Sequence, residues 1–428
     1  MLIEFTTGNF RCFKEPVTLS MVAARLNARD PEVDKNTTFK IDSDLKLLVS
    51  SAVYGANASG KSNLISAIAF MRNFVLNSSR ESQVEQPIPV EHFRLNTETK
   101  DRPSLFQIVF LADGEKFRYG FEVTSAKVAT EWLFTTGKRK EVRLFTRDGN
   151  GIHVGRPYKE GRRLEKITRR NALFLSVVAQ FNGPVASRLL DWFNKVGIVS
   201  GLDDTGYQGF TLKRFQSETH RQQIINLVRS LDVGIDDIAS EVIERSKVSF
   251  PTGMPRKLQE FLLEESQEFF AIKTTHKQFN PEGKVVAREI FDLGNQESHG
   301  TQKLFFLAGP IMHTLSEGRV LFVDELEARL HPLITCELIR LFQSGETNPL
   351  HAQLVFTTHD TNLLSNKRFR RDQIWFTEKD RQGAAYLYSL SELKVRNDAP
   401  FESDYIQGKY GAIPFLGDVR RVVFEGEK

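Results

Sequence analysis

Residues 55–62 read GANASGKS, which fits the pattern G-x-x-x-x-G-K-[ST] of a phosphate-binding loop. A mostly apolar run over 47–54 precedes the loop, and apolar residues at helical spacing follow it over 64–70. The sequence therefore predicts a buried strand, a glycine-rich loop and a helix, in that order. Such a loop lets backbone N–H groups and a helix N-terminus surround a phosphate group. A chance glycine turn is the alternative interpretation, and the two flanks argue against it.

The side chains of the loop have distinct expected roles. Lys61 is expected to contact the β- and γ-phosphates of a nucleotide, and Ser62 is expected to hold Mg²⁺. ATP is preferred over GTP, because residues 377–380 (TEKD) lack the asparagine of an N-K-x-D guanine motif. The predicted cofactors are therefore ATP and Mg²⁺. The predicted nucleotide-binding residues of the loop are Asn57, Ala58, Ser59, Gly60, Lys61, Ser62 and Asn63.

A pair of carboxylates follows a second predicted strand. Four apolar residues, 320–323, lead directly to Asp324 and Glu325. Because α/β sheets place their ligand sites at the carboxyl ends of strands, Asp324 is expected to bind Mg²⁺, directly or through water. Glu325 is expected to orient or deprotonate the attacking water as the catalytic base. Adjacent acids after a buried strand also occur as a plain solvated cap, and the upstream phosphate loop favours the catalytic interpretation.

Two further segments are suited to bind a phosphate. His359 follows a third predicted strand, 353–358, where an imidazole can hydrogen-bond a γ-phosphate and respond to its loss. An ordinary surface histidine is the alternative, which the order of the motifs disfavours. Ser298 and Gly300, in the segment SHGT, precede a predicted helix. Either they form an anion site at its N-terminus, or the segment only caps the helix through Ser298 or Thr301, and the residues alone leave both interpretations open.

The composition is that of an ordinary globular protein. The 428 residues suffice for two or three lobes, and the net charge of +4 permits nucleic-acid contact without arguing for it. Cys12 and Cys336 stand far apart, which fits a reducing compartment and no disulfide framework. The first residues do not resemble a signal peptide, and no apolar run is long enough to span a bilayer. We therefore expect a cytoplasmic protein without a membrane partner.

Strands alternate with helices around these motifs, which is typical of a parallel α/β sheet. A polar loop is predicted over 25–46 and another over 201–209. Further strands are predicted near 2–5 and 17–21, over 93–146 with a turn at 112–115, at 271–275 and 285–291 as a hairpin, and at 374–376 and 386–388. Further helices are predicted over 171–199, 221–231, 257–270, 301–315 and 332–342.

In this order, the motifs resemble those of the ATP-binding-cassette (ABC) ATPase heads of the RecF, OLD and structural-maintenance-of-chromosomes (SMC) group. The resemblance covers the N-terminal strands, the phosphate loop and then residues 292 to about 380. Within this group the chain looks most like the compact AAA-type ATP-binding proteins of bacterial anti-phage systems (RloA/AriA-like), which are encoded beside RloB-type or Toprim-type effectors. The segments behind this closer resemblance are 9–13 (NFRCF), Asn57, 298–301 (SHGT), 324–325 with 330–332 (LHP), 357–360 (TTHD) and 405–414 (YIQGKYGAIP).

The resemblance implies an α/β fold of the P-loop NTPase class. The expected architecture is an ABC-type head with a mixed sheet and helices, into which an antiparallel β lobe and a helical region are inserted. The expected domains are the N-terminal half of the head (1–80), the β lobe (85–150), the helical insertion (151–270), the C-terminal half of the head (271–390) and a C-terminal extension (391–428).

The resemblance also implies a mechanism. Two heads would pair head to tail, as a homodimer or within a higher oligomer, and would sandwich two ATP molecules. Each phosphate loop would face the Ser298–Gly300 element of the other copy, which is the counterpart of the cassette signature. Residues 328–331 would form the D-loop and His359 would be the switch histidine. The catalytic residues would be Glu325, His359 and Lys61.

A biological role follows from the same resemblance. Closure of the heads on ATP would regulate a nuclease- or toxin-like effector protein encoded nearby, in anti-phage defence. The alternative is a RecF-like DNA-repair or recombination ATPase that clamps DNA, and a third hypothesis is a nucleotide-gated scaffold with negligible turnover. Two basic stretches, 156–170 and 367–371, either contact DNA phosphates or are solvated faces, so DNA stays open as a partner.

The chain departs from the family pattern in three places. Segment 298–301 lacks the usual double glycine, and its glutamine is out of register. Gln107 is only a loose match to the Q-loop glutamine. Residues 422–427 (VVFEGE) resemble the opening strand of a Toprim nuclease, which needs further carboxylates on later strands. Because the sequence stops at Lys428, we expect no nuclease domain in cis.

Overall fold

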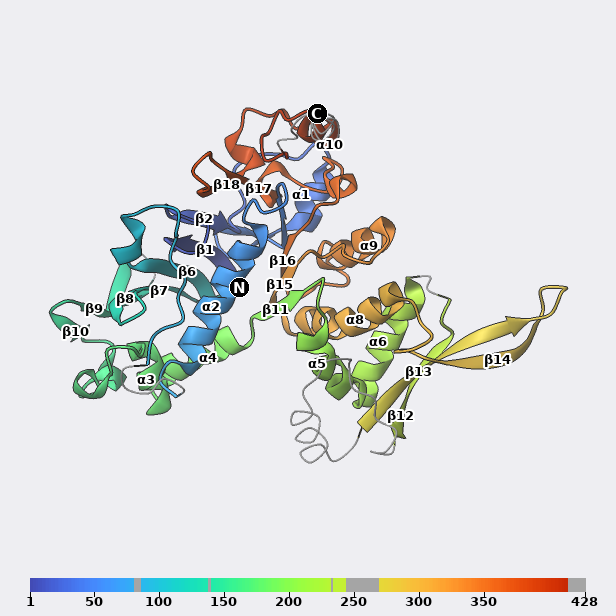
Figure 1. The fold of residues 1–428 in the computed structure, drawn as a ribbon, viewed down its shortest axis with the longest axis horizontal. Coiled ribbons are helices and arrows are strands. Elements are labelled where there is room, and N and C mark those ends of the chain that lie inside the picture. Colours follow the sequence, from blue (N-terminus) through green and yellow to red (C-terminus); the bar gives the residue numbers. More distant parts are fainter. Residues whose placement is uncertain (81–85, 138–139, 232–233, 244–268, 415–428) are drawn as a thin grey trace, which may run out of the picture. The chain divides into compact units, whose positions relative to one another are not determined.

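The computed structural model describes residues 1–80, 86–137, 140–231, 234–243 and 269–414 (Figure 1). The chain forms two compact units. Unit 1 comprises Met1–Ile198, Thr314–Glu327 and Leu338–Lys428, and unit 2 comprises Val199–His313 and Ala328–Glu337. This division differs from the expected domain bounds, because residues 151–198 belong to unit 1 together with the β lobe.

A mostly parallel sheet carries the nucleotide motifs, with the strand order β11-β15-β16-β5-β17-β18. The pairs β15–β16, β16–β5 and β5–β17 are parallel, and β18 is antiparallel to β17. The central strands β5 and β16 are buried along their whole length, which explains their near-continuous apolar sequences. The bounds are β5 (Ser50–Tyr54), β11 (Gly197–Ser200), β15 (Val320–Asp324), β16 (Gln353–Thr357), β17 (Ile374–Lys379) and β18 (Ala385–Ser389).

An antiparallel sheet of seven strands, in the order β10-β9-β8-β7-β6-β1-β2, also belongs to unit 1. Helix α2 (Lys61–Asn77) contacts both β1 of this sheet and β15 of the parallel sheet, and its apolar face joins the main core (Figure 1). The phosphate-loop helix is therefore held between two sheets. The strand bounds are β1 (Leu2–Gly8), β2 (Val17–Ser20), β6 (Ser104–Ala112), β7 (Glu115–Val123), β8 (Val128–Thr136), β9 (Glu141–Asp148) and β10 (Gly151–Val154).

The remaining helices of unit 1 are short, and unit 2 combines helices with a three-stranded antiparallel sheet, β12-β13-β14. Helices α3 (Phe174–Gln180), α4 (Pro184–Asn194) and α10 (Phe401–Ile406) belong to unit 1. Unit 2 contains α5 (Thr205–Phe215), α6 (Glu218–Ser230), β12 (Asp237–Ile243), β13 (Phe269–Phe279) and β14 (Val285–Asp292). The boundary between the units falls within α8 (His299–Glu317) and α9 (Pro332–Phe342).

Most of the predicted elements are confirmed, and the predicted loop over 25–46 is wrong. It contains α1 (Pro31–Thr37), β3 (Thr38–Lys40) and β4 (Lys46–Leu48). Helix α1 begins there because the Asp30 carboxylate accepts a hydrogen bond from the Glu32 amide and Pro31 occupies the first turn. The predicted loop over 201–209 is also partly wrong, since α5 begins at Thr205.

Two sequence predictions lie wholly or partly outside the described residues. Of the helix predicted over 257–270, residues 257–268 lie outside the described residues, and β13 begins at Phe269. The Toprim-like segment 422–427 also lies outside the described residues.

Candidate nucleotide-binding site

A cavity of about 500 Å³ in unit 1 lies over the phosphate loop. It brings together side chains from four segments that are far apart in the sequence. Glu325 follows β15, His359 follows β16, and Lys379 ends β17. The seven loop residues that line it are Asn57, Ala58, Ser59, Gly60, Lys61, Ser62 and Asn63. These are the loop residues that the sequence predicted, and their roles in binding remain predictions.

The loop keeps its shape through contacts that exclude other residues at Gly55. This glycine has a φ of 153°, and a Cβ atom there would lie 2.4 Å from the Thr377 carbonyl oxygen. The Ser59 hydroxyl is 2.6 Å from the Thr377 hydroxyl, which ties the loop to β17. β17 is the parallel neighbour of β5, the strand that leads into the loop. The pairing of these two strands therefore places Thr377 beside the loop.

The segment NFRCF supports the loop from the antiparallel sheet side of unit 1. The Asn63 side-chain amide donates a hydrogen bond to Cys12 Sγ at 3.0 Å, and a Cβ atom at Gly60 would lie 2.9 Å from the same sulfur. Phe10 packs edge-on against Phe106 of β6, with ring centroids 5.3 Å apart. The segment therefore fixes the start of α2 and has no direct place in the cavity lining.

Lys61 lines the cavity and is buried. Its ammonium group donates hydrogen bonds to the Gly55 carbonyl at 2.8 Å and to the Ala56 carbonyl at 3.1 Å. Burial lowers the pKa of Lys61 to about 8, although the nearby acidic side chains, Glu325 first among them, oppose this shift. The side chain is therefore still mostly charged at pH 7 and is suited to bind phosphate oxygens.

Asp324 and Glu325 stand at the carboxyl end of β15, as predicted from the sequence. Glu325 lines the cavity and has a φ of 51°, which is uncommon for a residue other than glycine. Within the described residues no group of three or more His, Cys, Asp or Glu side chains could hold a metal ion alone. Ser62 lines the cavity and Asp324 does not. A hydroxyl and a carboxylate are oxygen donors of the kind that Mg²⁺ takes, and this ion commonly has few protein ligands and completes its shell with phosphate oxygens and water, so the assignment of Ser62 and Asp324 to Mg²⁺ stays a prediction.

His359 follows β16, the parallel neighbour of β5, so it lies at the same edge of the sheet as the phosphate loop. Burial, and secondarily the Lys61 ammonium, lower the pKa of His359 below its ordinary value. The lowered pKa favours the neutral imidazole at pH 7. Its backbone N–H donates a hydrogen bond to the Glu327 carboxylate at 2.6 Å, which links this segment to the turn after β15.

The SHGT segment belongs to unit 2 and begins α8. The Ser298 hydroxyl accepts a hydrogen bond from the Thr301 amide at 3.1 Å, so Ser298 does cap the helix. A Cβ atom at Gly300 would lie 2.7 Å from the Arg329 carbonyl oxygen, so close packing accounts for this glycine. Capping explains Ser298 and close packing explains Gly300 within one chain, and their role toward a partner's nucleotide stays a prediction.

Two weaker candidates from the sequence have other contacts. The Gln107 side-chain oxygen accepts hydrogen bonds from Trp132 and Arg118 within the antiparallel sheet, and Gln107 does not line the cavity. Arg370, from the basic stretch 367–371, is buried and forms ion pairs with Asp34 and Asp372. Arg370 therefore stabilises unit 1 and is not available to DNA.

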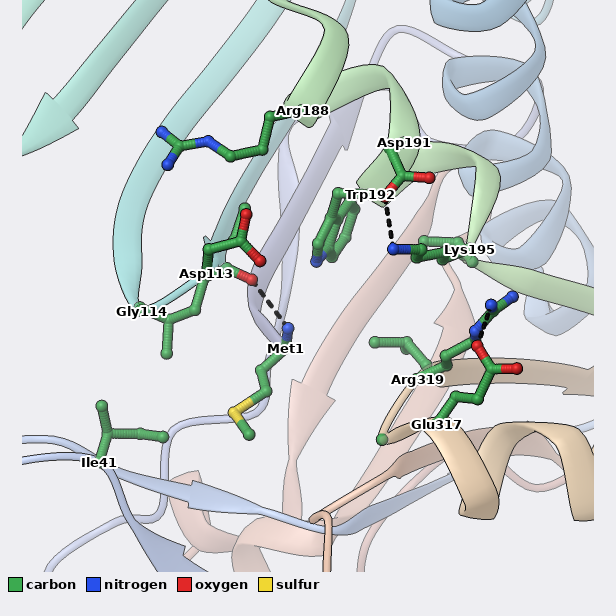
Figure 2. A pocket seen from close by; sticks show the side chains of 15 residues that line it. Met1, Ile41, Asp113, Gly114, Arg188, Asp191, Trp192, Lys195, Glu317 and Arg319 are labelled. Atoms are coloured by element: carbon green, nitrogen blue, oxygen red, sulfur yellow. Dashed lines mark hydrogen bonds and ion pairs between the residues drawn. The ribbon is translucent and has the colours of Figure 1, made fainter. Parts of the chain in front are cut away.

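A second cavity in unit 1, of about 380 Å³, has a different character (Figure 2). Trp192 and Met1 line it among charged side chains. Its cations are engaged by acids: Lys195 with Asp191, Arg319 with Glu317, and Arg188 with Glu115. None of the predicted nucleotide-binding residues lines this cavity, so the cavity over the phosphate loop is the candidate site.

Lys379 is the cavity residue that the sequence analysis missed. It follows the apolar residues 374–376, at the carboxyl end of a strand next to β5. A rule that every polar residue at such a strand end is a site candidate would have found it. The parallel pairing of β17 with β5 is part of the tertiary structure, however, and the residues 377–380 do not encode it by themselves.

A family model described as "AAA domain, putative AbiEii toxin, Type IV TA system" matches residues 50–365. A search of curated proteins found no match. Among solved structures, the SMC head domain from Thermotoga maritima aligns with a TM-score of 0.40 at 13% identity, over 92% of this chain and 99% of that chain. CbiO1 from Clostridium perfringens, part of the ABC transporter complex CbiONQ, aligns with a TM-score of 0.29 at 11% identity, over 87% of this chain and 89% of that chain.

Within the described residues, no helix is both long and apolar enough to cross a membrane. The family match begins at β5, just before the phosphate loop, and ends after His359, so it spans the loop, the acid pair and the segment that contains His359. Since this match covers more than half of the chain, the protein belongs to that AAA-domain family and has a P-loop NTPase fold.

Proposed function

We propose that the protein is a Mg²⁺-dependent ATPase whose heads close in pairs on ATP, and that this closure regulates an effector protein in anti-phage defence. The cavity over the phosphate loop is the observation that supports the catalytic part, because Lys61, Glu325 and His359 share it. The regulatory part is supported by the resemblance of the sequence motifs to those of anti-phage ATPases.

The side chains in the cavity divide the proposed reaction between them. The Lys61 ammonium and the loop amides bind the phosphates and hold the γ-phosphate for in-line attack. Glu325 orients the attacking water and accepts its proton. The neutral His359 imidazole hydrogen-bonds the γ-phosphate and responds to its release. Mg²⁺, when held by Ser62 and Asp324, would neutralise charge on the phosphates.

The substitution Glu325→Gln tests the catalytic assignment. The amide keeps the size of the side chain and cannot accept the proton, so we expect the turnover number for ATP to fall about 100-fold or more while ATP binding persists. Turnover is measured by phosphate release with Mg²⁺, and binding by a fluorescent ATP analogue.

Glu346→Gln, at an exposed position outside the cavity, is the matched control and should behave as the unmodified protein. Hydrolysis by Glu325→Gln at the unmodified rate would remove Glu325 from its proposed role.

Glu325→Gln should also trap a dimer when ATP is added, because it binds ATP without hydrolysing it. Light scattering after gel filtration detects this dimer.

The regulatory part calls for a different experiment. Tagged Glu325→Gln protein and unmodified protein are purified with ATP from cells that also carry the neighbouring genes, and the bound proteins are identified. We expect a stable complex with one protein encoded nearby, whose amount differs between the two forms. A RecF-like DNA clamp predicts instead ATP hydrolysis that DNA stimulates and DNA binding that weakens steeply with salt.

A further inference from the structure

Thr357 is placed to act on both acids of the proposed site. It is the last residue of β16, and the parallel pairing of Val323 with Phe356 puts it beside Asp324 of β15. Its side chain is fully buried. The hydroxyl oxygen lies 2.8 Å from the backbone nitrogen of Glu325 and 2.6 Å from Oδ1 of Asp324.

The chemistry of these groups fixes the direction of both hydrogen bonds. The Glu325 backbone N–H has only a proton to offer, so the Thr357 hydroxyl accepts it. The single hydroxyl proton must then point to Asp324, whose ionised carboxylate accepts only. The short distance to Asp324 fits an O–H···O⁻ hydrogen bond assisted by charge. One hydroxyl therefore connects the expected metal ligand to the backbone of the expected catalytic base.

The same residue holds the backbone of Glu325 in an uncommon conformation. Glu325 has a φ of 51°, a region that residues with a Cβ atom occupy only when their surroundings hold them there. The next amide along the chain, that of Leu326, donates a hydrogen bond to the Thr357 carbonyl at 3.2 Å. Two consecutive amides of the turn after β15 are thus bound to Thr357, and the turn directs Glu325 into the cavity.

We propose that Thr357 is a positioning residue for ATP hydrolysis, which orients the Asp324 carboxylate toward the metal ion and the Glu325 carboxylate toward the attacking water. This inference rests on the proposed function. It deepens that function, because Thr357 does not line the cavity and acts only through its two acidic neighbours. Serine could replace it, since only the hydroxyl is required, whereas valine, which has the same shape, could not.

The experiment compares Thr357→Val with Thr357→Ser in the full-length chain. We expect Thr357→Val to lower the turnover number for ATP about 10- to 100-fold and to raise the Mg²⁺ concentration needed for half-maximal rate, which is the usual effect of losing a partner of a metal ligand. Binding of a fluorescent ATP analogue without Mg²⁺ should stay within about 2-fold, because the phosphate loop is unchanged. Thr357→Ser should restore most of the turnover.

Thr7→Val is the matched control for a buried threonine. Thr7 lies in β1, is fully buried, and its hydroxyl has no hydrogen-bond partner among the described residues. This variant should keep the unmodified turnover. If Thr357→Val does not fold, as judged by circular dichroism and thermal melting, Thr357→Ala replaces it. A turnover number of Thr357→Ala about 10-fold or more below that of Thr357→Ser would then support the role of the hydroxyl, and equal turnover numbers would contradict it.

Distinct results would overturn the inference. Unmodified turnover by a folded Thr357→Val would show that the hydroxyl is not needed. Equal losses in Thr357→Val and Thr357→Ser, or a loss of ATP binding that matches the loss of turnover, would indicate a purely structural role. Absence of ATP hydrolysis by the unmodified protein would instead reject the proposed function, and the inference with it, so the two failures are told apart.

Discussion

At the scale of single residues, Lys61 is the side chain whose chemistry the fold changes most clearly. Its ammonium group is enclosed by the loop, and it donates hydrogen bonds to two loop carbonyls. Burial lowers its pKa from 10.5 to about 8, so the free protein begins to lose this charge just above physiological pH. Because a bound phosphate favours the charged lysine, binding of a nucleotide above pH 8 must be coupled to uptake of a proton.

This coupling predicts how ATP affinity depends on pH. The ATP phosphates are already ionised above pH 7, so the change comes from the protein. We expect the dissociation constant of ATP to be nearly constant from pH 7.0 to 7.5 and to rise by up to about 10-fold per pH unit above pH 8. Titration with a fluorescent ATP analogue at several pH values measures it.

Lys61→Met serves as the control, because it should bind weakly and show no such dependence above pH 8. A flat dissociation constant from pH 7 to 9.5 in the unmodified protein would contradict the prediction.

The free energy of unfolding without nucleotide should depend on pH in the opposite sense to ATP affinity. The unfolded chain, with a lysine pKa near 10.5, binds more protons between pH 8 and 10.5, so this residue alone makes the folded state more stable as the pH rises.

At the scale of secondary-structure elements, the sequence predicts those helices and strands that a local pattern of apolar and polar residues encodes. Buried parallel strands such as β15 and β16 are short apolar runs, and their polar ends mark the site. Helix α1 escaped this reasoning because most of its residues are exposed, and because Arg370 holds it through Asp34, a contact between residues 336 positions apart. Lys379 escaped it for the same reason, since only the pairing of β17 with β5 brings it to the cavity.

The loop between β5 and α2 yields a prediction at this scale. Gly55→Ala adds a Cβ atom 2.4 Å from the Thr377 carbonyl oxygen, at a φ of 153° that alanine rarely adopts. The loop must shift away from β17, so we expect a loss of about 1–3 kcal/mol of unfolding free energy and at least about 10-fold weaker ATP binding. Urea denaturation and titration with a fluorescent ATP analogue measure the two effects.

Gly149→Ala is the matched control, because an added Cβ atom there meets no atom within 4 Å. It lies in the turn between β9 and β10 of the antiparallel sheet. We expect it to leave both stability and ATP binding essentially unchanged. If Gly55→Ala behaved like this control, the close contact between the loop and β17 would not be required for nucleotide binding.

At the scale of the whole molecule, the proposed site residues divide between the two units. The phosphate loop, the acid pair and His359 belong to unit 1, and Ser298 and Gly300 belong to unit 2. If heads pair head to tail, Ser298 of one copy completes the site of the other copy. Within one chain, the N-terminal cap of α8 already explains Ser298. A role across the dimer therefore has to be tested with dimers whose two copies carry different substitutions.

A mixture of two inactive variants distinguishes a site that the partner copy completes from a site built within one chain. Ser298→Arg blocks the element that faces a partner, and Lys61→Met disables the phosphate loop, so each variant alone should lack ATP hydrolysis. In a mixed dimer, the intact loop of the first variant meets the intact Ser298 of the second, and one complete site is restored. Random pairing then predicts recovery of about one quarter of the unmodified rate. Because no single chain in the mixture carries both intact elements, a site built within one chain predicts no recovery, and phosphate release from the 1:1 mixture distinguishes the two arrangements.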